Sequence, residues 1–175
     1  MSEAIPKALL SGRSATMKGP DADRTHQQGT FGEMEKGILT LSDVEIMYLL
    51  EKDKISLVDS SGRALSMEDF LRLATGEDPD LWMRYLLYSD LRRRGYIVKP
   101  GFGPKLEYRV YRRGAEIGKE PAKYLVYGLV EGKPVSLHEI AAVSSSAKLS
   151  KKDLIFAVTD RQGEITYYDA SEIEF

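Results

Sequence analysis

Few side chains in this 175-residue sequence have the chemistry of a catalyst. The chain contains no cysteine and only two histidines, His26 and His138, which stand far apart in the sequence. Disulfides, thiol catalysis and thiolate metal sites are therefore excluded, and we expect neither a zinc site nor a cofactor. Tyr111, Lys151 and Lys152 are further residues whose side chains could take part in chemistry.

Taken one at a time, these residues have simpler explanations. Tyr111 ends an alternating segment and fits the more polar face of a strand. Lys151 and Lys152 precede an apolar segment and fit a solvated strand entrance, and His138 falls in a helix start. Composition alone therefore assigns a function to none of them.

Basic residues gather in the middle of the chain, although the net charge of −2 gives no overall attraction to nucleic acid. Residues 92–94 are three arginines that suit the carboxyl end of a helix dipole. A second group flanks a loop and could form a modest basic surface, with Tyr108 and Tyr111 available for base stacking. This group consists of Arg109, Arg112, Arg113, Lys119 and Lys123. Any RNA binding must therefore rest on a local surface or on a partner.

The first half of the chain is predicted to mix strands and helices. Glycine and proline interrupt residues 1–37, which indicates short strands and turns. Two capping boxes and an Asp-Pro start signal predict three helices, with Leu73 and Trp82 among their buried residues. The predicted helices cover residues 43–52, 67–75 and 79–94, and a short strand covers residues 55–58.

The second half is predicted to be mostly strand. A turn-rich stretch at residues 100–104 separates two small domains, residues 1–99 and 100–175, in an α+β fold. Alternation and apolar runs predict strands, and a third capping box predicts one helix. The strands cover residues 106–111, 124–130, 154–159 and 164–169, and the helix covers residues 137–148. The strand over residues 124–130 is expected at the centre of a sheet, and the last two strands are expected to form a hairpin.

Several of these segments, taken in order, resemble the archaeal tRNA-splicing endonuclease family. The segments SDLRRRGYIVKPGFG, YRVYRRG, AKYLV, SLHEI and KKDLIFAVTDRQGEITYY are similar to its catalytic domain, and LSDVEIMYLLEKDKI is similar to its N-terminal domain. The resemblance implies a mixed strand and helix domain followed by a restriction-endonuclease-like α/β domain with a mixed central sheet. It also implies a metal-independent reaction that cuts precursor tRNA introns at bulge-helix-bulge motifs and leaves a 2′,3′-cyclic phosphate.

The family is understood to use a tyrosine, a histidine and a lysine. By resemblance Tyr111 matches the tyrosine, and Lys152 matches the lysine, with Lys151 as the alternative. The histidine position, directly before AKYLV, is occupied by Pro121. Proline has no titratable group and no backbone N–H, so it can neither transfer a proton nor bind phosphate through its amide.

A second departure points the same way. Ala142 and Ser145 stand in a region where active members tend to present arginines to the RNA. The chain is therefore most similar to the structural subunit of the crenarchaeal heterotetramer, which contains two structural and two catalytic chains. In this interpretation Tyr111 and Lys152 are vestigial.

The resemblance also implies partners, whereas the location is expected from composition. No apolar run approaches the roughly 20 residues that span a bilayer, and the N-terminus is too polar for a signal peptide. We expect a cytoplasmic protein without membrane attachment that binds a catalytic paralogue and, through the complex, precursor tRNA. Edge-strand pairing through residues 164–168 and a docking loop carrying Asp160 and Glu164 are expected to join the subunits. Two alternatives remain open. One is an active endonuclease that relies on Tyr111 and Lys152 or recruits His138, and the other is a stand-alone RNA-binding protein that keeps a nuclease fold without nuclease activity.

Overall fold

Two compact units make up the chain, Met1–Tyr85 and Leu86–Phe175. The computed structural model describes residues 3–102 and 107–170, so Leu106 and the turn residues 103–104 lie outside the described residues. Helices and strands occur in both units, which confirms the α+β class and the two-domain layout. The predicted boundary between residues 99 and 100 stays a prediction, because the division by compactness falls inside a single helix, α4 (Leu81–Arg93).

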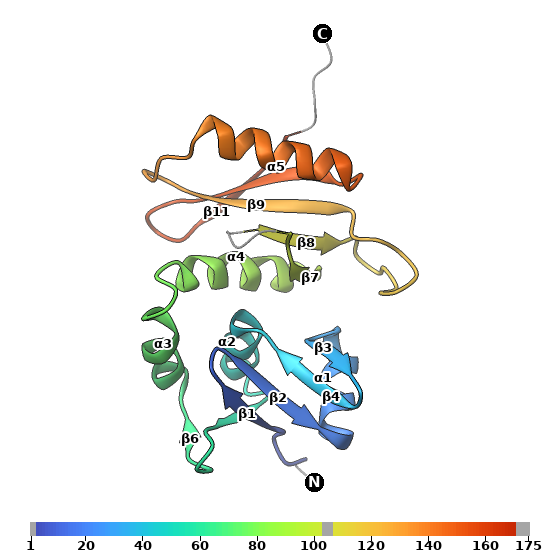
Figure 1. Ribbon diagram of the computed structural model, residues 1–175, viewed down its shortest axis with the longest axis vertical. Helices are drawn as coiled ribbons and strands as arrows, with labels where there is room; N and C mark the ends of the chain where they lie inside the picture. Colours follow the sequence, from blue (N-terminus) through green and yellow to red (C-terminus); the bar gives the residue numbers. More distant parts are fainter. Residues whose placement is uncertain (1–2, 103–106, 171–175) are drawn as a thin grey trace. The chain divides into compact units, whose positions relative to one another are not determined.

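A mixed sheet organises the first unit (Figure 1). Its described strands follow the order β3-β4-β2-β1-β5-β6, with β1 parallel to β5 and the other neighbours antiparallel. The strands are β1 (Lys7–Ser11), β2 (Ser14–Lys18), β3 (Glu33–Glu35), β4 (Ile38–Leu41), β5 (Ser56–Val58) and β6 (Ala64–Leu65). The core combines strand and helix residues, including Leu39, Leu57, Ile46, Met47 and Phe70.

Residues 19–29 form helix α1 (Gly19–Gly29), whereas the sequence predicted only strands and turns there. The two glycines bound the helix instead of interrupting it, and Pro20 occupies the first turn, where a missing N–H leaves no hydrogen bond unmade. Only Ala22 and Thr25 are buried. The helix therefore lacks the apolar stripe by which periodicity is recognised.

The three predicted capping boxes are confirmed at the starts of α2 (Asp43–Glu51), α3 (Met67–Thr75) and α5 (Leu137–Leu149). The hydroxyls of Ser66 and Ser136 accept the amides three residues later at 3.0 and 3.1 Å. At α2 the Glu45 carboxylate accepts both the amide and the hydroxyl of Ser42, at 2.9 and 3.0 Å. These local hydrogen bonds explain why the helix starts were predictable from four-residue patterns.

Helix α4 begins two residues later than predicted. The Asp78 carboxylate accepts the Asp80 amide at 3.0 Å, so a separate turn precedes the helix. The helix ends at Arg93, one residue earlier than predicted, and Gly95 has the left-handed conformation predicted for its stop, with φ 90°. The burial predicted for Leu73 and Trp82 is wrong, since these side chains are 58% and 46% exposed. Each lies beside the buried stripe of its helix, and apolar identity alone did not reveal this.

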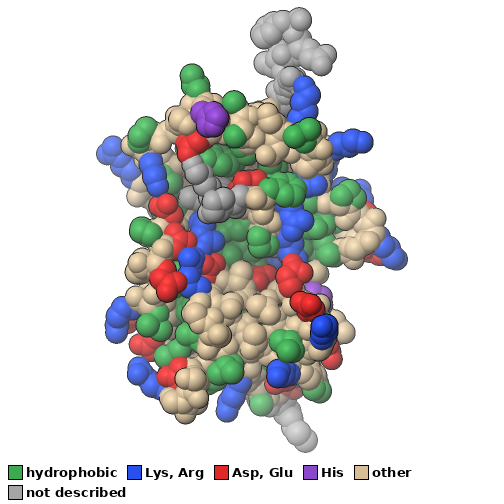
Figure 2. Space-filling view, in the orientation of Figure 1, with side chains coloured by type: hydrophobic (Ala, Val, Ile, Leu, Met, Phe, Trp, Pro, Cys, Tyr) green, Lys and Arg blue, Asp and Glu red, His purple; other side chains and the backbone are tan. Residues whose placement is uncertain are grey.

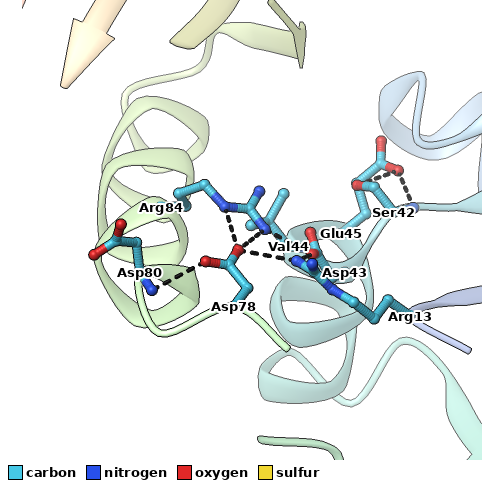
Figure 3. Close-up of polar contacts among 8 residues, drawn as sticks. All are labelled: Arg13, Ser42, Asp43, Val44, Glu45, Asp78, Asp80 and Arg84. Atoms are coloured by element: carbon cyan, nitrogen blue, oxygen red, sulfur yellow. Dashed lines mark hydrogen bonds and ion pairs between the residues drawn. The ribbon is translucent and has the colours of Figure 1, made fainter. Parts of the chain in front are cut away.

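Four charged side chains link separate segments of the first unit (Figure 3). Arg13, in the β1–β2 turn, bonds Asp43 at the start of α2 and Asp78 ahead of α4, the latter at 2.9 Å. Arg84 reaches the same two carboxylates at 2.6 and 2.8 Å. Two cations and two anions are thus balanced, and the turn before α4 is fixed to the sheet and to α2.

The second unit contains a five-stranded sheet with the described order β11-β10-β9-β8-β7. The strands are β7 (Ile97–Pro100), β8 (Glu107–Tyr111), β9 (Tyr124–Val130), β10 (Asp153–Thr159) and β11 (Ile165–Asp169). Strand β9 lies at the centre and pairs in parallel with β10 through a crossover that contains α5. Strands β10 and β11 form the predicted antiparallel hairpin.

Helices cover both faces of this sheet (Figure 1). On one face, Val143 and Ala147 of α5 contact Leu125, Tyr127 and Leu154. The end of α4 lies against the opposite face. This arrangement divides the strand side chains between two chemically different environments, and both contain candidate functional residues.

Candidate functional site

Tyr111 and Lys152, which stand far apart in the sequence, come to the same end of the second unit's sheet. The Lys123 amide donates to the Val110 carbonyl at 3.1 Å, and the Lys123 carbonyl accepts the Asp153 amide at 2.9 Å. Tyr111 directly follows Val110, and Lys152 directly precedes Asp153. Both residues therefore lie level with Lys123, one on each side of β9. Because two strand spacings separate them, their backbones are about 10 Å apart.

The register also places both side chains on the face covered by α5. Arg109 pairs with Leu125, which pairs with Leu154, and both leucines pack against Val143 and Ala147 of α5. Tyr111 and Lys152 lie two residues from members of this row and so share its face. The half-buried Tyr111 therefore lies on the less buried side of β8, as its alternation predicted.

An aromatic ring connects the two sides of this site. The Phe102 ring is 56% exposed and contacts two cations from either side of β9. The Arg109 guanidinium carbon lies 5.7 Å from the ring centre, and the Lys152 Nζ lies 5.9 Å from it. Lys152 Nζ also reaches the Ser150 carbonyl at 3.5 Å. Phe102 thus holds positive charge over the same face as Tyr111.

A recess of about 590 Å³ opens beside Lys152, between the last turns of α5 and the start of β10. Ser145 lines it, with Ser144 and Lys148 on the same helix. Ala142 is exposed on α5. Lys151 precedes the site in the left-handed region, with φ 55°, and is exposed, whereas Lys152 lines the recess.

The Pro121 segment reaches this same end of the sheet. Pro121 is exposed and lies two residues before Lys123. His138 lies in the first turn of α5, roughly 15 Å by helix rise from the recess residue Lys148. His26 belongs to the first unit, where its Nδ1 lies 2.8 Å from the Phe31 carbonyl.

The predicted docking loop lies at the opposite end of the sheet, between β10 and β11. One oxygen of Asp160 accepts the amides of Gln162 and Glu164, at 2.8 and 2.9 Å. Glu131 accepts the Arg161 amide at 3.3 Å. Asp160 therefore closes its own turn, and Glu164 is exposed beside it.

The predicted basic surface is only partly realised. Tyr108 is 4% exposed, so the expectation that it is available for stacking is wrong. Arg112 pairs with Glu120 at 3.0 Å, and the Arg109 Nε donates to the Pro100 carbonyl at 2.8 Å. On the face shown in Figure 2, Lys and Arg side chains are interspersed with Asp and Glu.

The sequence analysis missed a second recess, of about 300 Å³, on the sheet face that α4 covers. Three tyrosines line it, Tyr96, Tyr124 and Tyr167, together with Arg94 and Arg113. The only local indication was that Tyr124 and Val126, two residues apart on one strand, lie on the face of the sheet opposite Leu125. The grouping depends on a helix end and four strands, so no local pattern could reveal it.

Two further findings concern the described residues as a whole. Within residues 3–102 and 107–170, no group of three or more His, Asp or Glu side chains could hold a metal ion. Over the same ranges, no helix is long and apolar enough to cross a membrane.

Comparisons with known proteins agree along the whole chain. The family model for the tRNA intron endonuclease, N-terminal domain, matches residues 7–71. The family model for the tRNA intron endonuclease, catalytic C-terminal domain, matches residues 81–167. Proteins named tRNA-splicing endonuclease from Thermococcus onnurineus and Pyrococcus horikoshii are 33% and 35% identical, over all of both chains. One from Methanococcus vannielii is 34% identical over 95% of this chain and 93% of its own. With both domains matched in order and full-length relatives above 30% identity, the chain belongs to the tRNA intron endonuclease family.

Proposed function

We propose that this chain is the structural subunit of a heteromeric tRNA-splicing endonuclease, and that it assembles and positions a catalytic paralogue. The observation that carries the proposal is Pro121, at the position where the resemblance expects histidine. Its segment lies at the sheet end that also holds Tyr111 and Lys152. Two of the three matching groups are therefore present, and the third is a residue that cannot transfer a proton.

The chemistry of the reaction explains why this loss matters. One group must take the 2′-hydroxyl proton, another must protonate the leaving 5′-oxygen, and a cation must offset charge on the phosphorane. Removing a positioned acid or base typically costs roughly 10²- to 10⁴-fold in rate. A tyrosine and a lysine without the third group supply only part of this machinery.

The assembly proposal is supported by β11, which forms one edge of the described sheet. The hydrogen bonds from Asp160 N to Glu164 O and from Ala170 N to Leu154 O bracket the β10–β11 ladder. Alternation along an antiparallel strand directs the amides of Ile165, Tyr167 and Asp169 to the outer side. An edge of this kind is suited to pairing with a strand of the paralogue.

A second candidate is an active endonuclease in its own right. It is favoured by the full-length relatives, which are named as the enzyme, and by the approach of Tyr111 and Lys152 to one end of the sheet. In that case the proton donor would have to come from outside the Pro121 position.

One experiment separates the two candidates. The purified chain is incubated with a bulge-helix-bulge RNA, alone and together with a catalytic paralogue that carries the histidine. We expect cleavage only in the mixture, with both chains in one complex by size-exclusion chromatography. Cleavage by the chain alone would overturn the structural assignment. Failure to bind the paralogue would favour a stand-alone RNA-binding protein.

A further inference from the structure

We propose that the recess on the α4 face of the second unit's sheet, lined by Tyr96, Tyr124, Tyr167, Arg94 and Arg113, binds one unpaired nucleotide of RNA. This site is separate from the Tyr111 and Lys152 positions, which lie on the opposite, α5 face. The choice of RNA as the source of the nucleotide rests on the proposed function. The recess itself is defined by its geometry.

Aromatic rings form the walls of the recess. Tyr96 and Tyr124 meet edge to face, with ring centres 6.4 Å apart and planes at 87°. Two perpendicular rings make a corner in which a base can stack on one ring and contact the edge of the other. Val110, Val126 and Ile155 complete a mostly apolar lining. A volume of about 300 Å³ is at the small end of ligand pockets and suits a single base with its sugar.

One side of the recess is a fixed, charge-balanced wall. The Tyr167 hydroxyl donates to Asp90 at 2.6 Å, and the Arg94 Nε donates to the same oxygen at 2.7 Å. The Arg94 guanidinium lies 5.1 Å from the Tyr167 ring centre. Burial, followed by the bond to Asp90, raises the pKa of Tyr167. The phenol therefore stays neutral and presents its ring to the recess.

The other side carries a cation that is free to bind an anion. The exposed Arg113 guanidinium lies 4.7 Å from the centre of the Tyr96 ring. Among the described residues no carboxylate pairs with it, whereas its neighbour Arg112 is bound to Glu120. A guanidinium at the rim of an aromatic recess is placed to contact the phosphate of a nucleotide whose base lies against the tyrosines.

This composition favours a nucleotide over an acidic protein segment. Of the two cations that line the recess, Arg94 is paired with Asp90 and Arg113 is available, while Lys123 lies outside the lining, 5.3 Å from the Tyr124 ring centre. Three rings with these cations at their rim match a planar ligand that carries a phosphate. A carboxylate-rich peptide would need several cations and would leave the rings without a partner. Base stacking on aromatic side chains contributes roughly 1–3 kcal/mol per base, which corresponds to about a 5- to 150-fold change in affinity.

The test measures binding by the intact chain alone. Fluorescence anisotropy follows a labelled single-stranded RNA octamer, a matched octamer with abasic sugars, and competition by AMP. We expect Arg113→Gln and Tyr96→Leu each to weaken octamer binding about tenfold, and the abasic octamer to bind about as weakly. Arg112→Gln removes the same charge from the neighbouring residue and should change octamer binding less than twofold. Far-UV circular dichroism during thermal melting checks that both units of each variant fold.

Several outcomes would overturn the proposal. They are absence of binding by the unaltered chain, equal weakening by Arg112→Gln and Arg113→Gln, and equal binding of normal and abasic RNA. Displacement of the labelled octamer by AMP at a lower concentration than by the unlabelled octamer would assign the recess to a free nucleotide. Loss of paralogue binding in Arg113→Gln with intact RNA binding would assign it to a protein segment. The RNA-binding measurements contain neither paralogue nor cleavage, and paralogue binding is measured separately. Failure of RNA binding therefore leaves the structural-subunit proposal standing, and failure of that proposal leaves the RNA-binding result unchanged.

Discussion

At the residue scale, the proposed structural role rests mainly on Pro121, at the position where the resemblance expects histidine. The residue is exposed and lies in an irregular segment ahead of β9, so its side chain contributes little to the fold. A substitution there therefore tests chemistry with little effect on stability. Tyr111 and Lys152 already lie at the same end of the sheet.

Pro121→His should give the chain a measurable ability to cleave a bulge-helix-bulge RNA. An imidazole with an ordinary pKa near 6.5 can exchange a proton at neutral pH, and such a group contributes roughly 10²- to 10⁴-fold. Single-turnover cleavage, followed on denaturing gels, measures the change. Pro121→Ala should remain inactive, and adding Tyr111→Phe to Pro121→His should abolish the gain. Equal cleavage by the unaltered chain would contradict the prediction.

Asp160 poses a different question, because its carboxylate already closes the β10–β11 turn. Asp160→Asn keeps an acceptor oxygen for the two amides and removes only the charge. If the loop docks through that charge, this variant should weaken association of the heterodimers into a tetramer by about tenfold, measured by analytical ultracentrifugation, and leave heterodimers intact.

Asp160→Ala serves as the comparison for this prediction. It removes both the charge and the turn acceptor, so it should also lower thermal stability. An unchanged tetramer in Asp160→Asn would remove the docking role and leave the residue as a turn-former.

At the element scale, the exposed edge of β11 decides whether strand pairing joins the subunits. Ile165 begins this strand, and alternation directs its amide to the outer side. Proline at such a position keeps the native ladder, since the outward amide takes no part in it.

Ile165→Pro should therefore block the addition of a strand to β11 without unfolding the sheet. We expect at least tenfold weaker binding to the catalytic paralogue, measured by isothermal titration calorimetry. Ile165→Ala also removes the native side chain but keeps the amide, and it should bind like the unaltered chain. Equal weakening by both variants would point to the side chain and not to strand pairing.

At the scale of the whole molecule, the first unit depends on a network that no local pattern reveals. The network joins the β1–β2 turn, helix α2, the turn before α4 and helix α4, through Arg13, Asp43, Asp78 and Arg84 in that order (Figure 3). Their side chains are between 10% and 32% exposed. Burial by itself would raise the pKa of Asp78, but the hydrogen bonds and charge of Arg84, with the Asp80 amide and Arg13, outweigh it and lower that pKa.

Asp78→Asn should lower the free energy of unfolding by about 1–3 kcal/mol at neutral pH, because it removes a charge-assisted partner from both arginines. The folded-state pKa of Asp78 lies below its ordinary value of 3.8. Its stabilising contribution is therefore complete above about pH 4 and is lost as the pH falls through the folded pKa.

Urea unfolding followed by Trp82 fluorescence at several pH values measures this contribution. Trp82 is the only tryptophan of the chain and lies in the first unit. The difference between the unaltered protein and Asp78→Asn should shrink as the pH falls below 4. Asp59 and Asp69, whose pKa values are lowered by hydrogen bonds from Ser61 and Ser66, remain in both proteins and cancel in the comparison. A difference that stays constant down to pH 2 would contradict the prediction.

The sequence by itself determined the features that depend on neighbouring residues. Capping serines, the left-handed stop at Gly95, the alternation in β8 and the hairpin between β10 and β11 are local, and all are present. Helix α1 escaped prediction because its glycines mark its ends and its few buried residues form no apolar stripe.

Only the tertiary structure decided which distant residues meet. Strand β9 brings Tyr111, Pro121 and Lys152 to one end of the sheet through its pairing with β8 on one side and β10 on the other. The opposite face collects Arg94, Tyr96, Arg113, Tyr124 and Tyr167 into a recess that no local pattern predicts beyond the alternation of Tyr124 with Val126. Strand register and helix crossover set these meetings, and both depend on long-range pairing that is not encoded in any short segment.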